Sequence, residues 1–206
     1  GQGCRSIAEI AEKSDILITM LPNSAIVREV ISGSADAILT HAKKGQLVMD
    51  MSTVSPETTD FVALCCAEKE IDFIDAPVSG GQAGAENGNL TVMVGGDDAA
   101  FSMALPLMEC YGARVVHMGP AGKGQQAKMV NQICIAGLLQ ALSEGLNFAM
   151  DVGLDTDKLL EAISGGAAQS WQMVNRGDTM IKGEFDFGFA VDWMRKDLRI
   201  CMTEAK

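Results

Sequence analysis

The first 118 residues alternate between short, continuous apolar runs and segments in which apolar residues recur with helical spacing. Apolar runs of this length, rich in Val, Ile, Leu and Met, are typical of strands that are buried on both faces. They lie at residues 15–20, 46–50, 71–78, 90–94 and 114–118. The helical segments lie at residues 6–12, 24–31, 35–42, 56–70 and 97–110. This alternation predicts an α/β fold with a largely parallel, doubly wound sheet covered by helices.

After residue 118 no further strand is apparent, and the apolar residues follow helical periodicity only. The predicted helices occupy residues 122–150, 155–164, 170–181 and 191–206. The change from mixed α/β to all-α composition near Gly119 places a domain boundary there. We therefore predict an α/β domain at residues 1–118 and an all-α domain with a long central helix at residues 119–206.

The helix predicted at residues 122–150 is apolar in nearly every helical direction from Met129 onward, and such a helix is expected to be buried. Because a buried lysine needs a partner, we expect the amine of Lys128 to face a cavity. Asn131, three residues on, shares that face. Together they could hold a carbonyl oxygen and deliver a proton to it. Alternatively, Lys128 lies on an exposed first turn and only its stem packs on apolar surface.

A turn with two consecutive glycines, Ser79-Gly80-Gly81, follows the strand predicted at residues 71–78. Glycine lets a backbone approach a ligand closely, and successive N–H groups form a concavity for an anion such as a carboxylate. The turn therefore predicts a carboxylate site. The alternative is a glycine-rich connection to the strand at residues 90–94 that binds nothing.

Two further loops, Leu21-Pro22-Asn23 and Ser52-Thr53, follow predicted strands, and in doubly wound sheets ligands bind beyond the carboxyl ends of strands. Ser52 and Thr53 could hydrogen-bond a cofactor, or they could cap the helix expected to begin at Ser55-Pro56. Dinucleotide-binding domains hold the phosphates with a GxGxxG turn between a strand and a helix. The one candidate in this sequence is Gly1-Gln2-Gly3, and no strand precedes it. The last predicted helix also runs to the final residue, Lys206. We therefore expect a chain that is cut at both ends.

The chain has 206 residues, enough for two small domains, and a formal net charge of −11 without a basic run. This charge argues against nucleic acid or an anionic membrane as the main partner. No apolar run reaches a membrane span without interruption, and we see no signal peptide. The six cysteines lack CxxC spacing, which is typical of reduced residues in a cytoplasmic protein. His41 and His117 lack metal-ligand spacing, so we expect no metal site.

Six motifs occur in order along the chain. They are Leu21-Pro22-Asn23, Asp50-Met51-Ser52-Thr53-Val54-Ser55-Pro56, Asp75-Ala76-Pro77-Val78-Ser79-Gly80-Gly81, Met93-Val94-Gly95-Gly96-Asp97, Gly122-x-Gly124-x-x-x-Lys128-x-x-Asn131 and Lys196-Asp197-Leu198. This order resembles the β-hydroxyacid dehydrogenase family, which includes 3-hydroxyisobutyrate dehydrogenase, 2-hydroxy-3-oxopropionate (tartronate semialdehyde) reductase and the glyoxylate–succinic semialdehyde reductases. The resemblance covers essentially the whole chain. It implies a Rossmann-like NAD(P)-binding domain at residues 1–118, incomplete at its N-terminus, and an all-α substrate and dimerisation domain at residues 119–206, incomplete at its C-terminus.

The resemblance also implies roles for single residues. Lys128 matches the catalytic lysine of the family, and Gln132 is closer to the tartronate semialdehyde branch than to the Asn-Asn pair of the hydroxyisobutyrate enzymes. The implied substrate-binding residues are Ser79, Gly80, Gly81, Asn131, Phe189 and Asp197, and the implied cofactor contacts are Leu21, Pro22, Thr53 and Lys196.

The implied reaction is reversible hydride transfer between NAD or NADP and a short β-hydroxyacid or its semialdehyde, with Lys128 as acid and base. A homodimer or homotetramer is also implied, and the apolar helix favours it. One alternative is an oxidative decarboxylase similar to 6-phosphogluconate dehydrogenase, although such enzymes place His and Asn where this chain has Asn131 and Gln132. The other is a catalytically silent dimerising module. An imine reductase is disfavoured because that branch replaces the lysine.

Overall fold

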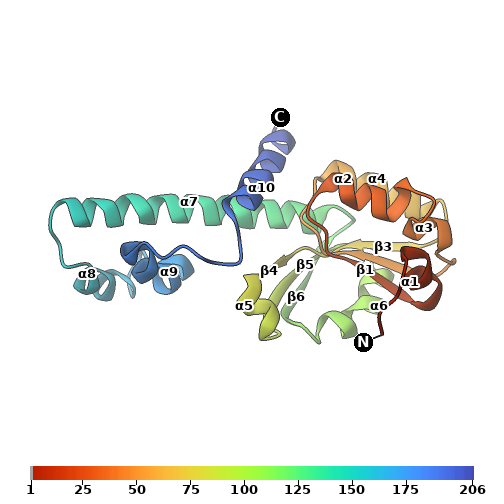
Figure 1. Ribbon diagram of the computed structural model, residues 1–206, viewed down its shortest axis with the longest axis horizontal. Coiled ribbons are helices and arrows are strands. Elements are labelled where there is room, and N and C mark those ends of the chain that lie inside the picture. Colours follow the sequence, from red (N-terminus) through yellow and green to blue (C-terminus); the bar gives the residue numbers. More distant parts are fainter. Residues whose placement is uncertain (1) are drawn as a thin grey trace. The chain divides into compact units, whose positions relative to one another are not determined.

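The computed structural model describes residues 2–206 and divides into two compact units (Figure 1). The first unit comprises Gly1–Val130 together with Arg195–Lys206, and the second comprises Asn131–Met194. All strands of the described chain belong to the first unit. The helices α7 and α10 each begin in one unit and end in the other.

Six strands form one sheet in the order β1-β2-β3-β5-β4, with β6 paired to β5. The strands β1, β2 and β3 are parallel to one another and β6 is parallel to β5, whereas β5 is antiparallel to β3 and β4. Their bounds are Ile16–Thr19 (β1), Leu47–Asp50 (β2), Asp72–Asp75 (β3), Val78–Ser79 (β4), Leu90–Gly96 (β5) and Gly112–Gly119 (β6). The predicted α/β fold is confirmed, and every predicted apolar run contributes to a strand.

The single strand expected at residues 71–78 is divided into β3 and β4. Both pieces pair with β5 in one continuous register, Asp75 opposite Gly95 and Val78 opposite Val92. The break falls at Ala76 and Pro77, because proline has no N–H to donate to a ladder. The return from β4 to β5 is too short for a parallel crossover, so β5 runs antiparallel to β4 and β3.

The sheet is covered on both faces, as a doubly wound fold requires. Because side chains alternate along a strand, Leu17, Val48 and Phe73 pack into one apolar cluster and Met49 and Ile74 into another. Helices α2 and α4 lie on one side and α6 on the other (Figure 1). The helices of this unit are α1 (Ile7–Lys13), α2 (Ser24–Arg28), the π-helical turn η1 (Glu29–Gly33), α3 (Ile38–His41), α4 (Pro56–Ala67), α5 (Gly81–Glu86) and α6 (Asp98–Met108).

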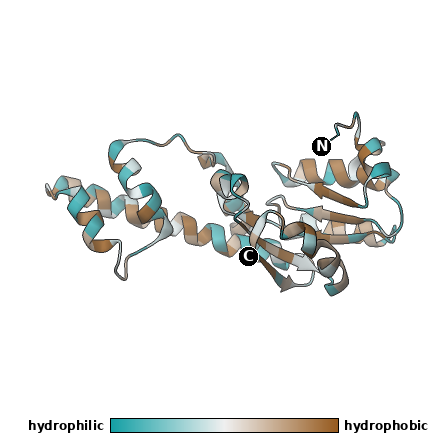
Figure 2. Ribbon diagram, turned by 90° about the horizontal axis from the view of Figure 1, so that it is seen from below, coloured by the Kyte–Doolittle hydropathy of each residue, from teal (hydrophilic) through white to brown (hydrophobic). Residues whose placement is uncertain are grey.

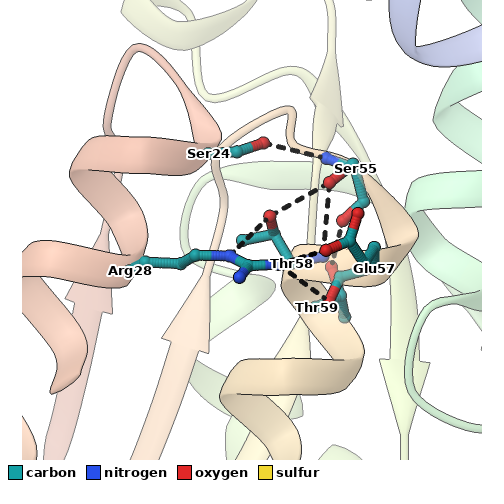
Figure 3. A network of polar contacts seen from close by, with 6 residues as sticks. All are labelled: Ser24, Arg28, Ser55, Glu57, Thr58 and Thr59. Carbon is teal, nitrogen blue, oxygen red and sulfur yellow. Dashed lines mark hydrogen bonds and ion pairs between the residues drawn. The ribbon is translucent and has the colours of Figure 1, made fainter. Parts of the chain in front are cut away.

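A polar network ties α2 to the start of α4 (Figure 3). Ser55 caps α4, since its hydroxyl accepts from the backbone N–H of Thr58 at 3.2 Å, and Pro56 follows in the first turn, as predicted. The hydroxyl of Ser24 accepts from the N–H of Ser55, and Arg28 reaches across from α2 to Thr58 and to the carboxylate of Glu57. These contacts hold the loop that leads from β2 into α4.

The second unit is helical. It contains most of α7 (Lys123–Asp151), the helices α8 (Thr156–Ile163) and α9 (Trp171–Lys182), and the first residues of α10 (Val191–Glu204). Its small core consists of Leu142, Leu146 and Met173, with Leu160 and Ile163 packed against them. The four helices predicted after residue 118 are therefore all present.

The expectation that the long helix is buried is wrong for most of α7. Met129, Leu142 and Leu146 are buried, but Val130 is 61% and Phe148 64% exposed. Hydrophobic residues recur along this helix (Figure 2), and the described chain supplies too few neighbours to cover them. By length and composition alone α7 is the one described helix that could cross a membrane, although core helices of soluble proteins pass the same test.

The end of β3 is joined to the start of α7 by one buried carboxylate. Asp75 is fully buried; its Oδ1 accepts from the N–H of Gly122 at 2.7 Å and its Oδ2 from the N–H of Gln125 at 2.8 Å. These are N–H groups that the first turn of a helix leaves without an internal partner. Gly95 and Gly124 surround the carboxylate, and a Cβ at either position would collide with it.

Replacing Asp75 by Asn should destabilise the first unit. The Asn side chain keeps one oxygen and replaces the other by an NH₂ group, so the N–H of Gly122 or of Gln125 would lose its acceptor and face another donor. We expect this to lower the free energy of unfolding by about 2 kcal/mol or more. Denaturant unfolding at about pH 8, above the pKa of about 6 to which burial raises this carboxyl, measures the change. The control is Asp72→Asn, an exposed residue of the same strand. Equal unfolding midpoints for the two variants would contradict the role of Asp75.

Candidate active site

Three loops and the start of α7 meet at one edge of the sheet. Because β1, β2 and β3 are parallel, the loops that follow them, beginning at Met20, Met51 and Ala76, leave from the same edge. The helix α7 begins there as well, since its first turn binds Asp75 at the end of β3. Ligands of doubly wound sheets bind at this edge.

The loops after β1 and β2 are fixed to each other by a buried hydrogen-bond network. Asp50, at the end of β2, accepts from the hydroxyl of Thr19 at 2.9 Å and from the backbone N–H of Ser52 at 3.0 Å. The hydroxyl of Ser52 accepts from the N–H of Leu21 at 2.8 Å. Burial raises the pKa of the Asp50 carboxyl, and the hydrogen bonds from Ser52 and Thr19 oppose that shift. This network explains why Ser52 does not cap α4, which Ser55 does instead.

Gln125 in the first turn of α7 holds the loop after β2 from the other side. Its side chain is fully buried; Nε2 donates to the carbonyl oxygen of Ser52 at 2.7 Å, and Oε1 accepts from the N–H of Val54 at 3.1 Å. The carbonyl between them, that of Thr53, accepts from the amine of Lys196 at 2.6 Å. Three successive backbone positions are thus held by two side chains from α7 and α10.

Lys128 lies on α7 one turn after Gly124, on the same helical face. Its side chain is only 7% exposed, so it does not lie on an open first turn. Burial lowers the pKa of its amine to about 8, while the nearby carboxylate of Asp197 raises it and the ammonium of Lys196 lowers it. An amine with a pKa near neutrality can donate and accept a proton under physiological conditions.

Asp197 and Lys196 are neighbours on α10 and form an ion pair, with 2.8 Å between the Lys196 amine and Oδ1 of Asp197. Asp197 is buried and Lys196 is partly buried. The predicted residues Thr53, Lys128, Lys196 and Asp197 therefore belong to one electrostatically connected group in the first unit.

The Ser79-Gly80-Gly81 turn also lies against β5. Ser79 pairs with Thr91, and two residues further along β5 the carbonyl of Met93 packs against Gly124 of α7. Gly80 has φ 137° and Gly81 has φ 63°. Residues that carry a Cβ rarely adopt these backbone conformations, so glycine is favoured at both positions. The turn leads into the short helix α5, so the connection between the strands is helical rather than a plain loop.

The remaining predicted residues have simple positions. Leu21 is half-buried and Pro22 exposed at the sheet edge, where Asn23 caps α2 by accepting from the N–H of Ile26 at 3.0 Å. Asn131 belongs to the second unit; its amide donates to the side chain of Gln132, which is buried. Phe189, half exposed before α10, belongs to that unit too. The roles of these residues stay predictions.

Sequence reasoning missed three residues that organise the site: Asp50, Asp75 and Gln125. Each lies inside one of the six motifs named above. The residues around each of them, however, do not distinguish a buried structural role from a surface position. A polar residue that ends an apolar strand, as Asp50 and Asp75 do, is the available signal. Among the described residues no group of His, Cys, Asp and Glu could hold a metal ion.

Comparison with known proteins bears on the identity of this site. Residues 1–119 match the family described as the NAD binding domain of 6-phosphogluconate dehydrogenase, and residues 122–206 match the family described as NAD-binding of NADP-dependent 3-hydroxyisobutyrate dehydrogenase. The chain is 50% identical over 198 residues to an uncharacterized oxidoreductase of Shewanella frigidimarina, covering 96% of this chain and 68% of that protein.

Two characterised relatives are also similar. The chain is 39% identical over 198 residues to 2-hydroxy-3-oxopropionate reductase of Escherichia coli, covering 96% of this chain and 68% of the relative. The structure of Mycobacterium tuberculosis 3-hydroxyisobutyrate dehydrogenase with L-serine superposes with a TM-score of 0.86 at 31% identity, covering 98% of this chain and 70% of that one.

The matched nucleotide-binding families together with the relatives define an NAD(P)-dependent oxidoreductase that acts on CH–OH groups. Within that class, the chain belongs to the β-hydroxyacid dehydrogenase family, as the relatives and the matched families agree. The family, the class of enzyme and the NAD(P) cofactor predicted from the sequence are confirmed.

The residues at the sheet edge fit a nicotinamide dinucleotide. Asp50 and Asp75 are the two buried carboxylates at this edge, and both accept hydrogen bonds from groups of the protein. These protein donors compensate their negative charge, which reduces the repulsion of an anionic ligand. The half-buried Leu21 and Thr53 stand at the edge, and Lys196 supplies a cation beside Thr53. Apolar contacts with a few polar groups are typical of cofactor sites.

Gln125→Met should loosen the loop after β2. The change keeps an unbranched side chain of similar length but leaves the carbonyl of Ser52 and the N–H of Val54 without their buried partner, which costs about 2–4 kcal/mol. We expect a lower unfolding midpoint and a several-fold weaker affinity for NAD(P)H, measured by fluorescence titration. Gln140→Met, at an exposed position of the same helix, is the control. An unchanged unfolding midpoint in the Gln125 variant would show that its two hydrogen bonds do not hold the loop after β2.

Proposed function

We propose that the protein interconverts a short β-hydroxyacid and its semialdehyde, as 2-hydroxy-3-oxopropionate reductase or a 3-hydroxyisobutyrate dehydrogenase-like enzyme would. The observation that carries this proposal is the buried amine of Lys128, with a pKa lowered to about 8, beside the edge of a dinucleotide-binding sheet. The relatives that act on such compounds support the substrate class. Gln132 favours the 2-hydroxy-3-oxopropionate branch.

In reduction, the ammonium of Lys128 donates a hydrogen bond to the carbonyl oxygen of the substrate and gives it a proton as the alkoxide forms. In oxidation, the neutral amine accepts the hydroxyl proton. The chemistry that a bound nicotinamide would supply is hydride transfer to or from the substrate carbon. The protein's part is to hold the reacting oxygen at the amine and to keep water away from it, which the burial of Lys128 favours.

The other site residues position the reactants in this proposal. The backbone of Ser79, Gly80 and Gly81 binds the substrate carboxylate, and Asn131 and Phe189 contact the rest of the substrate. Leu21, Pro22 and Thr53 contact the cofactor, with Lys196 beside them. The α-helical region also forms a homodimer or homotetramer that covers the exposed apolar residues of α7, such as Val130 and Phe148.

Lys128→Ala should lower kcat by about 10²–10⁴-fold, the usual contribution of a general acid or base, while the NAD(P)H affinity stays near that of the wild type. Steady-state assays with 2-hydroxy-3-oxopropionate and with 3-hydroxyisobutyrate measure the loss. Lys123→Ala, which removes an exposed lysine from the first turn of the same helix, is the matched control. Wild-type turnover in the Lys128 variant would refute the proposed chemistry.

The two directions of the reaction should depend on pH in opposite ways. Reduction needs the protonated amine, so its kcat/KM should fall as the pH rises through about 8, the pKa of Lys128. Oxidation needs the neutral amine, so its kcat/KM should rise over the same range and then level off. Paired pH–rate profiles check this. Two profiles that change in the same direction would contradict acid–base catalysis by Lys128.

A further inference from the structure

Gln132 places a large polar side chain in the buried part of α7. It is only 2% exposed, although glutamine lies mostly at protein surfaces. It follows Lys128 by four residues, so the two side chains are neighbours on the helix. A buried amide needs hydrogen-bond partners, because leaving its polar atoms unpaired would destabilise the fold. The partner of Gln132 therefore indicates what this residue does.

The oxygen of Gln132 binds the side chain of the preceding residue. Nδ2 of Asn131 donates to Oε1 of Gln132 at 2.8 Å. Successive helical residues point in directions about 100° apart, so their side chains do not normally meet. The Gln132 side chain is one methylene longer than an asparagine and reaches across. Because Gln132 is buried and Asn131 only half-buried, tight packing restrains Gln132 more, and Gln132 orients Asn131.

This contact decides which end of the Asn131 amide points where. The two ends of the amide have similar shapes, but Oδ1 only accepts hydrogen bonds and Nδ2 only donates them. Turning the amide over would bring Oδ1 against Oε1 of Gln132, two acceptors with no proton between them. The hydrogen bond therefore directs Oδ1 away from Gln132. Since an amide oxygen has two lone pairs, Oδ1 can accept from a ligand in addition to a donor of the protein.

The proposed reaction leaves one substrate group for Asn131. Lys128 binds the reacting oxygen, and the backbone of residues 79–81 binds the carboxylate. A three-carbon semialdehyde acid has one further substituent, on the carbon between these two groups. Asn131 follows Lys128 by three residues, which puts their Cβ atoms about 5–6 Å apart on the helix. That separation suits two side chains that bind substituents of adjacent carbons.

We propose that Gln132 is a positioning residue that turns Asn131 so that its Oδ1 atom meets the substituent on C2 of the substrate. A hydrogen-bond acceptor binds a hydroxyl group there and gains nothing from a methyl group. 2-Hydroxy-3-oxopropionate carries a hydroxyl group on C2, whereas the semialdehyde of 3-hydroxyisobutyrate carries a methyl group. The inference rests on the proposed function, in which Asn131 contacts the substrate, and it narrows the substrate to 2-hydroxy semialdehyde acids.

The test compares 2-hydroxy-3-oxopropionate with 2-methyl-3-oxopropionate, which differ only in the C2 group, in the full chain. Gln132→Met keeps the length of the side chain and removes the acceptor. The kcat/KM for the hydroxy compound should fall about tenfold, the usual weight of one hydrogen bond, and that for the methyl compound should stay nearly unchanged. Gln132→Glu, which keeps an acceptor at the same reach, should retain the wild-type preference. Gln140→Met, at an exposed position of α7, is the matched control.

A purely structural role of Gln132 would lower the two kcat/KM values together, and that result would overturn the proposal. An unchanged ratio of the two values in Gln132→Met would overturn it as well. Unfolding midpoints accompany the assays. If Gln132→Met does not fold, Gln132→Asn takes its place: the shorter amide does not reach Asn131, so the preference for the hydroxy compound should again decrease.

Side-chain amide NMR reads the contact itself, without any substrate. One Nδ2 proton of Asn131, assigned by its loss in Asn131→Asp, should exchange with solvent about tenfold faster in Gln132→Met than in the wild type. Equal exchange rates in the two proteins would refute the positioning role. If the wild type turns over neither substrate, the proposed function fails, while the exchange rates still decide whether Gln132 holds Asn131.

Discussion

The carboxylate of Asp75 determines where the long helix starts. From the end of β3 it accepts from the N–H groups of Gly122 and Gln125 at the start of α7, and a Cβ at Gly95 or Gly124 would collide with it. A negative charge at this position also complements the positive end of the helix dipole. Since Gln125 and Lys128 lie on that first part of α7, their positions relative to the sheet depend on this contact.

A second consequence concerns the loop after β2. Asp50 and Ser52 fix it to the loop after β1, and Gln125 and Lys196 hold it from α7 and α10. Most of the polar groups at the carboxyl edge of the sheet thus bind the protein itself. The protein is acidic as a whole, yet the group around Lys128 contains two lysines and one carboxylate. Local burial, rather than net charge, sets the chemistry of this site.

The sequence allowed most of the fold to be predicted, for a local reason. Short apolar runs and helical spacing are properties of neighbouring residues, and so are the cap at Ser55 and the proline at position 56. The break at Ala76 and Pro77 and the antiparallel direction of β5 were missed, because they depend on pairing with a distant strand. The burial of α7 was predicted wrongly, since a helix's own pattern does not say whether neighbours cover it.

By itself, the sequence determined the order of strands and helices, the motifs that identify the family, and Lys128 as the residue to examine. Only the tertiary structure decided that Gln125 holds residues 52–54, that Lys196 binds Thr53, and that Asp197 and Lys128 are buried. These partners come from distant parts of the chain, and they meet because α7 and α10 pack at the sheet edge. Such packing depends on how whole elements fit together, and no local pattern of residues encodes it.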